Sequence, residues 1–284
     1  MPDALIATFS QTGTTTQVAE RIATGLRAAG WQVDLHDITP GAVPDLNGYD
    51  LLGIGTPTYF FRPPFVVQDF VHALPKLEGK PSFVFVLCGV HQGACGNQIR
   101  ARLRAKGAKD VGYFCCFGAD YWMGYVKRGI LFSPDSPTEG ELAAAEAFGG
   151  TIAKRCDSTA SGIDPYDGPT PFMYAIERTS VIRPFARLLY SKLFRADDNC
   201  NGCGVCIKKC PVGNITATVD GKPRWHSNCI LCVTCELACP KEAIYSPFDC
   251  ALFAPFMSYN IQKGIKMGHP YARVEHTRGK THRV

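Results

Sequence analysis

The sequence predicts an α/β protein with two parts: a doubly wound parallel sheet in residues 1–155, followed by a small α+β domain built around cysteines. In the first part, short apolar runs alternate with amphipathic stretches, as strands alternate with helices in parallel sheets. A polar loop rich in hydroxyl groups joins the first strand to the first helix. In the second part, eight of the 14 cysteines fall in two nearly identical runs.

The apolar runs define the expected elements of the first part. We expect strands at residues 4–9, 31–37, 51–55, 82–88 and 111–117, and helices at residues 17–29, 64–74, 95–106 and 139–154. In such a sheet the ligand binds beyond the carboxyl ends of the strands, where the strand order reverses. The loops at residues 10–15, 56–61 and 89–93 should therefore converge on one pocket.

The first of these loops has the composition of a phosphate site. Hydroxyl groups of Ser10, Thr12, Thr14 and Thr15, with backbone N–H groups at a helix N-terminus, can hold a phosphate without Lys or Arg. A Walker loop would need Gly-Lys-Ser/Thr, which this loop lacks. The alternative is a Ser/Thr-rich helix cap that binds no ligand.

The cysteine runs predict the chemistry of the second part. Their members are spaced two, two and three residues apart, and a proline follows each run: Cys200, Cys203, Cys206, Cys210 and Pro211, then Cys229, Cys232, Cys235, Cys239 and Pro240. This is the bacterial ferredoxin pattern for two [4Fe-4S] clusters, in which the last cysteine of each run binds the other cluster. That pattern pairs Cys239 with the first run and Cys210 with the second. Zinc sites and disulfides are the alternatives.

Residues 1–155 resemble a flavodoxin, because the phosphate-loop motif of that family is matched by Ser10, Thr12, Gly13 and Thr15. Flavodoxins bind FMN, and the resemblance implies that two further loops flank the isoalloxazine ring. Tyr59 or Phe60 would stack on the ring, unless Tyr59 packs under its own loop; His91 would contact the ring edge or face solvent. The implied flavin contacts are Ser10, Gln11, Thr12, Gly13, Thr14, Thr15, Thr56, Pro57, Thr58, Tyr59, Phe60, Gly89, Val90, His91 and Gly93.

The whole chain resembles the small family of anaerobe ferredoxins whose N-terminal region is flavodoxin-like. The expected domains are a flavodoxin-like FMN domain at residues 1–155, a linker with a connecting helix at 156–195, a two-cluster ferredoxin domain at 196–248 and a basic tail at 249–284. Residues 157–171 have the composition of a domain boundary. Residues 172–194 predict a helix kinked at Pro184, with a membrane-surface helix as the alternative.

Two features differ from ordinary flavodoxins. Residues 1–155 are charge-balanced, which argues against a freely diffusing, acidic electron carrier. Residues 58–62 contain no glycine, whereas flavodoxins usually have a glycine there whose peptide flips and stabilises the flavin semiquinone. The absence of this glycine favours transfer of two electrons by the flavin. Residues 118–138 form a long expected loop with Tyr121, Trp122, Met123 and Tyr125, which would cover the flavin, receive the cluster domain or fill a local core.

Composition limits the setting and the partners. No apolar run is long enough to span a membrane, and the chain starts without a signal-peptide pattern, so we expect a cytoplasmic protein. A reducing compartment would keep the remaining six cysteines unpaired: Cys88, Cys95, Cys115, Cys116, Cys156 and Cys250.

Residues 251–284 hold six basic and one acidic side chain, which accounts for the net charge of +5. This end would bind an acidic partner or be solvated, and we favour the solvated end. We expect no nucleic-acid partner.

The main functional hypothesis is a relay of single electrons between two [4Fe-4S] clusters and FMN. The alternative is an FMN-dependent reductase of a quinone-like or other small acceptor, fed by its own clusters; a scaffold or redox sensor ranks last. No second dinucleotide fingerprint is visible, so electrons are expected from another ferredoxin, flavoprotein or iron–sulfur enzyme. The sequence does not define the oligomeric state.

Overall fold

The computed structural model describes residues 1–38, 43–156 and 167–284, and it divides into two compact units. The N-terminal unit comprises residues 1–118 and 135–178, and the cysteine unit comprises residues 119–134 and 179–284. Most of the predicted boundary segment, residues 157–166, lies outside the described residues. The domain limits expected from the sequence remain predictions, and each unit is described by itself.

The N-terminal unit contains a five-stranded parallel sheet with the order β2-β1-β3-β4-β5. All five predicted strands are confirmed: β1 (Asp3–Thr8), β2 (Gln32–Asp37), β3 (Leu51–Pro57), β4 (Pro81–Cys88) and β5 (Lys109–Phe117). Strands β1, β3 and β4 are buried over most of their length, because helices cover both faces of the sheet. This strand order is that of the flavodoxin-like fold.

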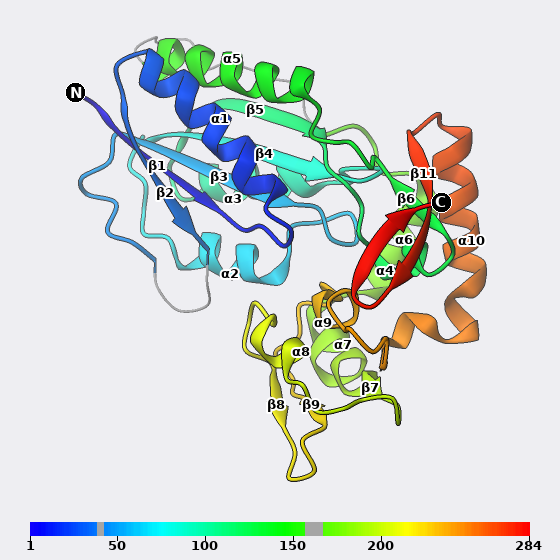
Figure 1. Cartoon of the computed structure of the whole chain (residues 1–284). Helices are drawn as coiled ribbons and strands as arrows, with labels where there is room; N and C mark the ends of the chain where they lie inside the picture. Colours follow the sequence, from blue (N-terminus) through cyan, green and yellow to red (C-terminus); the bar gives the residue numbers. More distant parts are fainter. Residues whose placement is uncertain (39–42, 157–166) are drawn as a thin grey trace. The chain divides into compact units, whose positions relative to one another are not determined.

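Four long helices cover this sheet, as predicted: α1 (Thr14–Ala28), α2 (Phe65–Ala73), α3 (Cys95–Ala105) and α5 (Glu139–Cys156). Figure 1 shows α1 and α5 on one face and α2 and α3 on the other. Connections between parallel strands are right-handed. The chain moves in one direction across the sheet from β1 to β2 and in the opposite direction from β3 to β5, so the helices of these connections lie on opposite faces.

Helices α1 and α5 approach each other through two glycines. A Cβ atom at Gly25 would lie 1.9 Å from the carbonyl oxygen of Glu146, and one at Gly149 would lie 2.2 Å from that of Ile22. The two backbones are therefore in contact. Around this contact, Ile22 and Ile152 are fully buried in the core that α1 and α5 share with the sheet.

In the cysteine unit, the two cysteine runs form matching local structures. Each run contains a four-residue helix, α8 (Val205–Lys208) and α9 (Thr234–Leu237), and a left-handed residue precedes each helix: Gly204 (φ 71°) and Val233 (φ 52°). Left-handed geometry is costly for a β-branched residue, so the second run folds this way under tertiary constraint. Short antiparallel pairs flank the helices: β8 (Ile215–Ala217) with β9 (Pro223–Trp225), and β7 (Arg195–Ala196) with β10 (Ile244–Tyr245).

The C-terminal segment, expected as a basic tail, is folded. After the short 3-10 turns η2 (Pro247–Asp249) and η3 (Ala251–Phe253), it forms α10 (Ala254–Lys266), β11 (Tyr271–Thr277) and β12 (Lys280–Arg283). Strand β11 pairs with β6 (Ile130–Phe132) of the same unit. The basic side chains are nevertheless mostly exposed, and the buried positions Met257 and Val274 hold the segment in place.

The segment at residues 118–138 is not the long irregular loop that was expected. It contains α4 (Met123–Val126) and β6, and most of it belongs to the cysteine unit. Met123 and Tyr125 are buried, and the Trp122 ring packs edge-on against Phe248 at 4.9 Å between centroids. These contacts support the interpretation that the aromatic residues fill a local core.

The predicted kinked helix at residues 172–194 is wrong as a single element. The chain forms α6 (Phe172–Ser180), α7 (Arg183–Leu188) and the 3-10 turn η1 (Tyr190–Leu193). Pro184 lies in the first turn of α7, where its missing N–H costs nothing, so the helix restarts before proline instead of bending around it. No helix in the described parts of the chain is long and apolar enough to cross a membrane.

The contact between α1 and α5 gives a first prediction. Gly149→Ala should destabilise the N-terminal unit by about 2 kcal/mol, because the new methyl group must push two helix backbones apart. Gly150→Ala is the matched control. The nearest atom to its Cβ lies at 4.0 Å, so helix propensity should stabilise this variant by up to about 1 kcal/mol. Urea unfolding followed by circular dichroism measures both, and equal effects would contradict the proposed clash.

Candidate cofactor sites

Three loops of the N-terminal unit leave the sheet at the carboxyl ends of β1, β3 and β4, which are neighbours. Backbone hydrogen bonds fix the loops where they begin. The N–H of Phe9 donates to the Gly55 carbonyl at 3.1 Å, and the N–H of Thr58 donates to the Leu87 carbonyl at 2.8 Å. The fold thus brings the loops at residues 10–15, 56–61 and 89–93 to one edge of the sheet.

The first loop places its hydroxyl groups at the N-terminus of α1. Gly13 caps the helix in a left-handed conformation (φ 89°), and Ser10 Oγ accepts a hydrogen bond from the Thr15 N–H at 3.2 Å. The hydroxyls of Thr12 and Thr14 lie 3.4 Å apart, and the first turn of α1 carries no carboxylate. A 15-residue helix that begins next to hydroxyl and N–H groups, of which the Thr12 side chain is exposed, provides an electropositive site for a phosphate.

Tyr59 links the second loop to the first. Its hydroxyl donates to the side-chain carbonyl of Gln11, and its ring lies edge-on to Phe9 at 6.2 Å between centroids. Thr56 is fully buried and donates its hydroxyl to the Pro57 carbonyl at 2.9 Å, so it supports the loop from inside. Val90 is also buried. Thr56 and Val90 therefore act through the shape of the loops.

The second loop turns without glycine, in a strained conformation. Phe60 and Phe61 both have positive φ angles, 48° and 61°, and Tyr59 and Arg62 exchange two backbone hydrogen bonds of 2.9 and 3.1 Å. This is the geometry of a type I′ turn, which normally takes Asn and Gly. The Phe61 ring is held by stacking on buried Tyr174, with centroids 4.3 Å apart and planes inclined by 10°.

The third loop fits against this turn. A Cβ atom at Gly93 would lie 2.4 Å from the Phe61 carbonyl oxygen, so only glycine allows this approach. The Gly93 N–H donates to His91 Nδ1 at 2.8 Å, and the His91 ring lies edge-on to Tyr174 at 5.7 Å. His91 therefore belongs to an aromatic cluster with Phe61 and Tyr174, and its contact with a flavin stays a prediction.

Phe61, Tyr174 and Asp167 were not identified from the sequence. Asp167 is buried; it accepts hydrogen bonds from the Asn97 N–H at 2.8 Å and from the Tyr113 hydroxyl. It thereby fixes the segment that carries Tyr174 to the sheet domain. No sequence pattern marks these residues, because Asp167 and Tyr174 lie beyond the last predicted element of the sheet domain.

Positive charge lies beside the turn. Burial lowers the pKa of Arg62 to about 10, and repulsion from Arg178 acts in the same direction. With this pKa the Arg62 guanidinium remains charged at neutral pH. It provides a cationic group for an anionic ligand at this edge of the sheet.

The cysteine unit brings the two runs together in the crossed arrangement. One cavity is lined by three cysteines of the first run and the last cysteine of the second: Cys200, Cys203, Cys206 and Cys239. Cys210 of the first run lies close enough to Cys229 and Cys232 of the second to affect the electrostatics of both thiols. None of the 14 cysteines forms a disulfide.

The surroundings of these thiols suit an iron–sulfur cluster. Burial raises the pKa of Cys206, Cys232 and Cys235, and it raises the pKa of Cys229 to about 12. Buried thiolates need a nearby positive charge, which the iron core of a cluster supplies. The N–H of Leu231 donates to Cys229 Sγ at 3.3 Å, and the hydroxyl of Thr234 donates to Cys232 Sγ at 3.2 Å. Hydrogen bonds of this kind tune cluster potentials.

A buried ion-pair network supports helix α9 next to Cys235. Glu236 is only 3% exposed and pairs with Lys127, the residue that follows α4, whose Nζ also lies 2.9 Å from Asp249 Oδ2. Burial raises the pKa of Glu236 to about 7, although attraction to Lys127 opposes that shift. The network connects residues far apart in sequence, so the sequence alone did not reveal it.

Comparison with known proteins agrees with this geometry. A family model described as a flavodoxin domain matches residues 5–127, and one described as a 4Fe-4S dicluster domain matches residues 199–244. No curated protein matches the chain significantly.

Solved flavodoxin structures align with the first half. A flavodoxin from the domain Archaea is 17% identical, covering 55% of this chain and 99% of its own, with a TM-score of 0.43. The Streptococcus pneumonia TIGR4 flavodoxin is 22% identical (54% and 99%; TM-score 0.44), and that of Megasphaera elsdenii is 24% identical (53% and 98%; TM-score 0.41). The two family models therefore make the chain an electron-transfer iron–sulfur flavoprotein, in which a flavodoxin domain precedes a 4Fe-4S dicluster ferredoxin domain.

Proposed function

We propose that the protein relays single electrons between two [4Fe-4S] clusters and FMN. The observation that carries this proposal is the crossed cysteine arrangement, in which Cys239 joins the first run and Cys210 approaches the second. Each cluster would take three thiolates from one run and one from the other. Because the runs exchange their last ligands, the two clusters would lie side by side, as electron hopping requires.

FMN is the proposed flavin. The loop at residues 10–15 offers hydroxyl and N–H groups for one terminal phosphate, and no adenylate site is visible in the sequence. Bound FMN accepts one or two electrons, whereas each cluster carries one. Electrons that arrive singly through the clusters can therefore accumulate on the FMN. The strained Phe60–Phe61 turn and its contact with Gly93 would hold the loops in a fixed shape around the ring.

The alternative of a small-molecule reductase gains no support from the described residues. That hypothesis relies on the aromatic residues near position 122 as a substrate cover. Met123 and Tyr125 are buried in the cysteine unit, and Trp122 packs against Phe248 and Met257. We therefore favour the relay.

Single cysteine replacements test the ligand assignment. Cys206→Ala should remove the cluster bound by Cys200, Cys203 and Cys239, whereas Cys210→Ala should impair the cluster bound by the second run. EPR spectra of the anaerobically reduced protein, with iron analysis, distinguish the two variants, and Cys250→Ala serves as a control because this exposed cysteine lies outside both runs. An unchanged second cluster in Cys210→Ala would contradict the crossed assignment.

A charge in the hydroxyl loop tests the flavin. Thr12→Glu places a carboxylate where the phosphate is expected, so like charges should weaken FMN binding at least about tenfold. Thr12 is exposed, so the fold should tolerate this change. Thr24→Glu adds the same charge to an exposed position of α1 and should leave the affinity nearly unchanged. Fluorescence titration of the apoprotein measures both, and preferential binding of FAD would contradict the proposal.

Stopped-flow reduction tests the relay itself. With an acidic reduced ferredoxin as donor, the flavin of the intact chain should be reduced much faster than that of the full-length Cys203→Ala/Cys232→Ala variant, which lacks a ligand to each cluster. FMN affinity of the variant, measured in parallel, shows whether its N-terminal unit is intact. Equal flavin reduction rates would mean that the clusters take no part in flavin reduction, and the relay would be wrong.

A further inference from the structure

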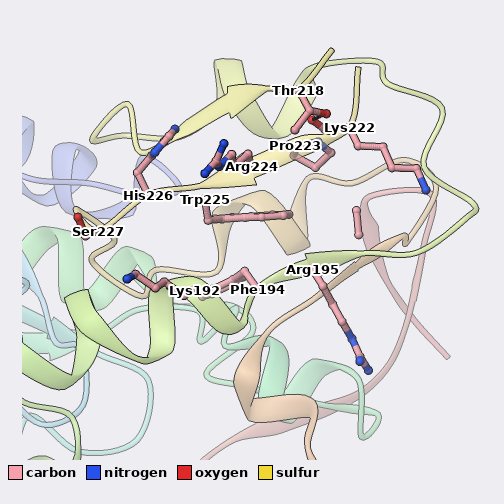
Figure 2. Close-up of a pocket in the computed structure, with 11 residues that line it drawn as sticks. Lys192, Phe194, Arg195, Thr218, Lys222, Pro223, Arg224, Trp225, His226 and Ser227 are labelled. Atoms are coloured by element: carbon pink, nitrogen blue, oxygen red, sulfur yellow. Dashed lines mark hydrogen bonds between the residues drawn. The ribbon is translucent and has the colours of Figure 1, made fainter. Parts of the chain in front are cut away.

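The cysteine unit contains an open groove with basic walls. It has a volume of about 630 Å³ and lies between the β8–β9 hairpin and the segment that follows η1 (Figure 2). Phe194 and Trp225 stack within it, with ring centroids 5.8 Å apart. Its basic lining residues are Lys192, Arg195, Lys222, Arg224 and His226, and none of the residues that line it is acidic.

The positive charge of this groove is largely uncompensated. Lys192 and Arg224 are exposed, and neither has a carboxylate partner within the described residues. Lys222 pairs with Asp198 at 3.1 Å, but Asp198 is fully exposed, and such pairs neutralise little. Arg195 lies over the Tyr245 ring at 5.7 Å, an interaction that leaves its charge intact. The groove therefore attracts anions.

The charge of the whole unit reinforces this attraction. Its residues include 17 lysines and arginines but only eight aspartates and glutamates. An excess of one sign spread over a unit produces a field that accelerates the approach of an oppositely charged protein. The groove is thus the basic concave part of a unit that is basic as a whole.

The groove borders the cavity of the crossed cysteines. Pro223 lines both the groove and the cavity that contains Cys200, Cys203, Cys206 and Cys239. A protein seated in the groove would therefore stand beside that cluster site. Leu189 and Leu193 are each 50% exposed next to Lys192 and add apolar surface, so the area combines apolar contacts with a charged rim, as protein interfaces do.

We propose that this groove is the docking site for an acidic redox protein that exchanges electrons with the cluster held by Cys200, Cys203, Cys206 and Cys239. The exchange rests on the proposed function; the docking itself does not. The transfer moves one electron between the reduced iron–sulfur centre of the partner and the oxidised cluster, and no bond or proton is exchanged. Carboxylates around the partner's cofactor would meet Lys192 and Arg224.

Equilibrium binding between oxidised proteins tests the docking. The probe is an acidic plant-type [2Fe-2S] ferredoxin, titrated into the full-length holoprotein by calorimetry at low ionic strength. Lys192→Glu/Arg224→Glu should weaken binding at least about tenfold, and raising the ionic strength to about 0.5 M should weaken wild-type binding similarly. Lys266→Glu/Lys280→Glu reverses two exposed charges outside the groove lining and should weaken binding less than about threefold.

The result that would overturn the proposal is an equal loss of affinity in both variants, because net charge would then explain the binding. Absence of ferredoxin binding, combined with binding of the holoprotein to vesicles containing phosphatidylserine, would also overturn it, because the groove would then face a lipid surface. The relay is tested separately, by stopped-flow reduction of the Cys203→Ala/Cys232→Ala variant. A failure of the relay in that experiment would leave the ferredoxin-binding result unchanged, so the two proposals can fail separately.

Discussion

The reversal of strand order between β1 and β3 is the constraint on which the N-terminal unit depends. Right-handed connections place α1 on one face of the sheet and α2 on the other, so the loops after β1 and β3 leave the sheet at the point where the strand order reverses. Every candidate flavin contact predicted from the sequence lies in these loops or in the loop after β4. The glycine contact through Gly25 and Gly149 lets α1 and α5 pack closely on their shared face of the sheet.

Local strain is concentrated where the loops meet. A type I′ turn made of two phenylalanines is costly, and the turn persists because three contacts hold it: the stacking of Phe61 on Tyr174, the backbone bond from Ala94 to Phe61 and the close approach of Gly93. A glycine in the turn would make its peptide free to rotate. The contacts instead fix one shape, which suits a site that must keep a flat ring in a constant position.

The cysteine unit combines buried cysteine side chains with a strongly basic groove. Burial disfavours the thiolates, and the cluster cores would compensate for that cost from inside. The basic groove beside the first cluster site is exposed, so its field acts outward on partners. The Lys127–Glu236–Asp249 network connects α4, α9 and the chain after β10, and so stabilises the second cysteine run from behind.

The sequence by itself determined the five strands, the four sheet helices, the hydroxyl loop and the cysteine pattern, because each depends on local periodicity or on spacing along the chain. Only the tertiary structure decided which distant residues meet. Tyr174 and Asp167 lie beyond the last predicted element of the sheet domain, yet they anchor the loop region through contacts that no local pattern encodes. Strand β11 forms because β6 offers it a backbone edge far earlier in the chain: the paired residues Tyr271 and Phe132 are 139 positions apart. Hydrogen bonds between distant strands leave no signal in either segment alone.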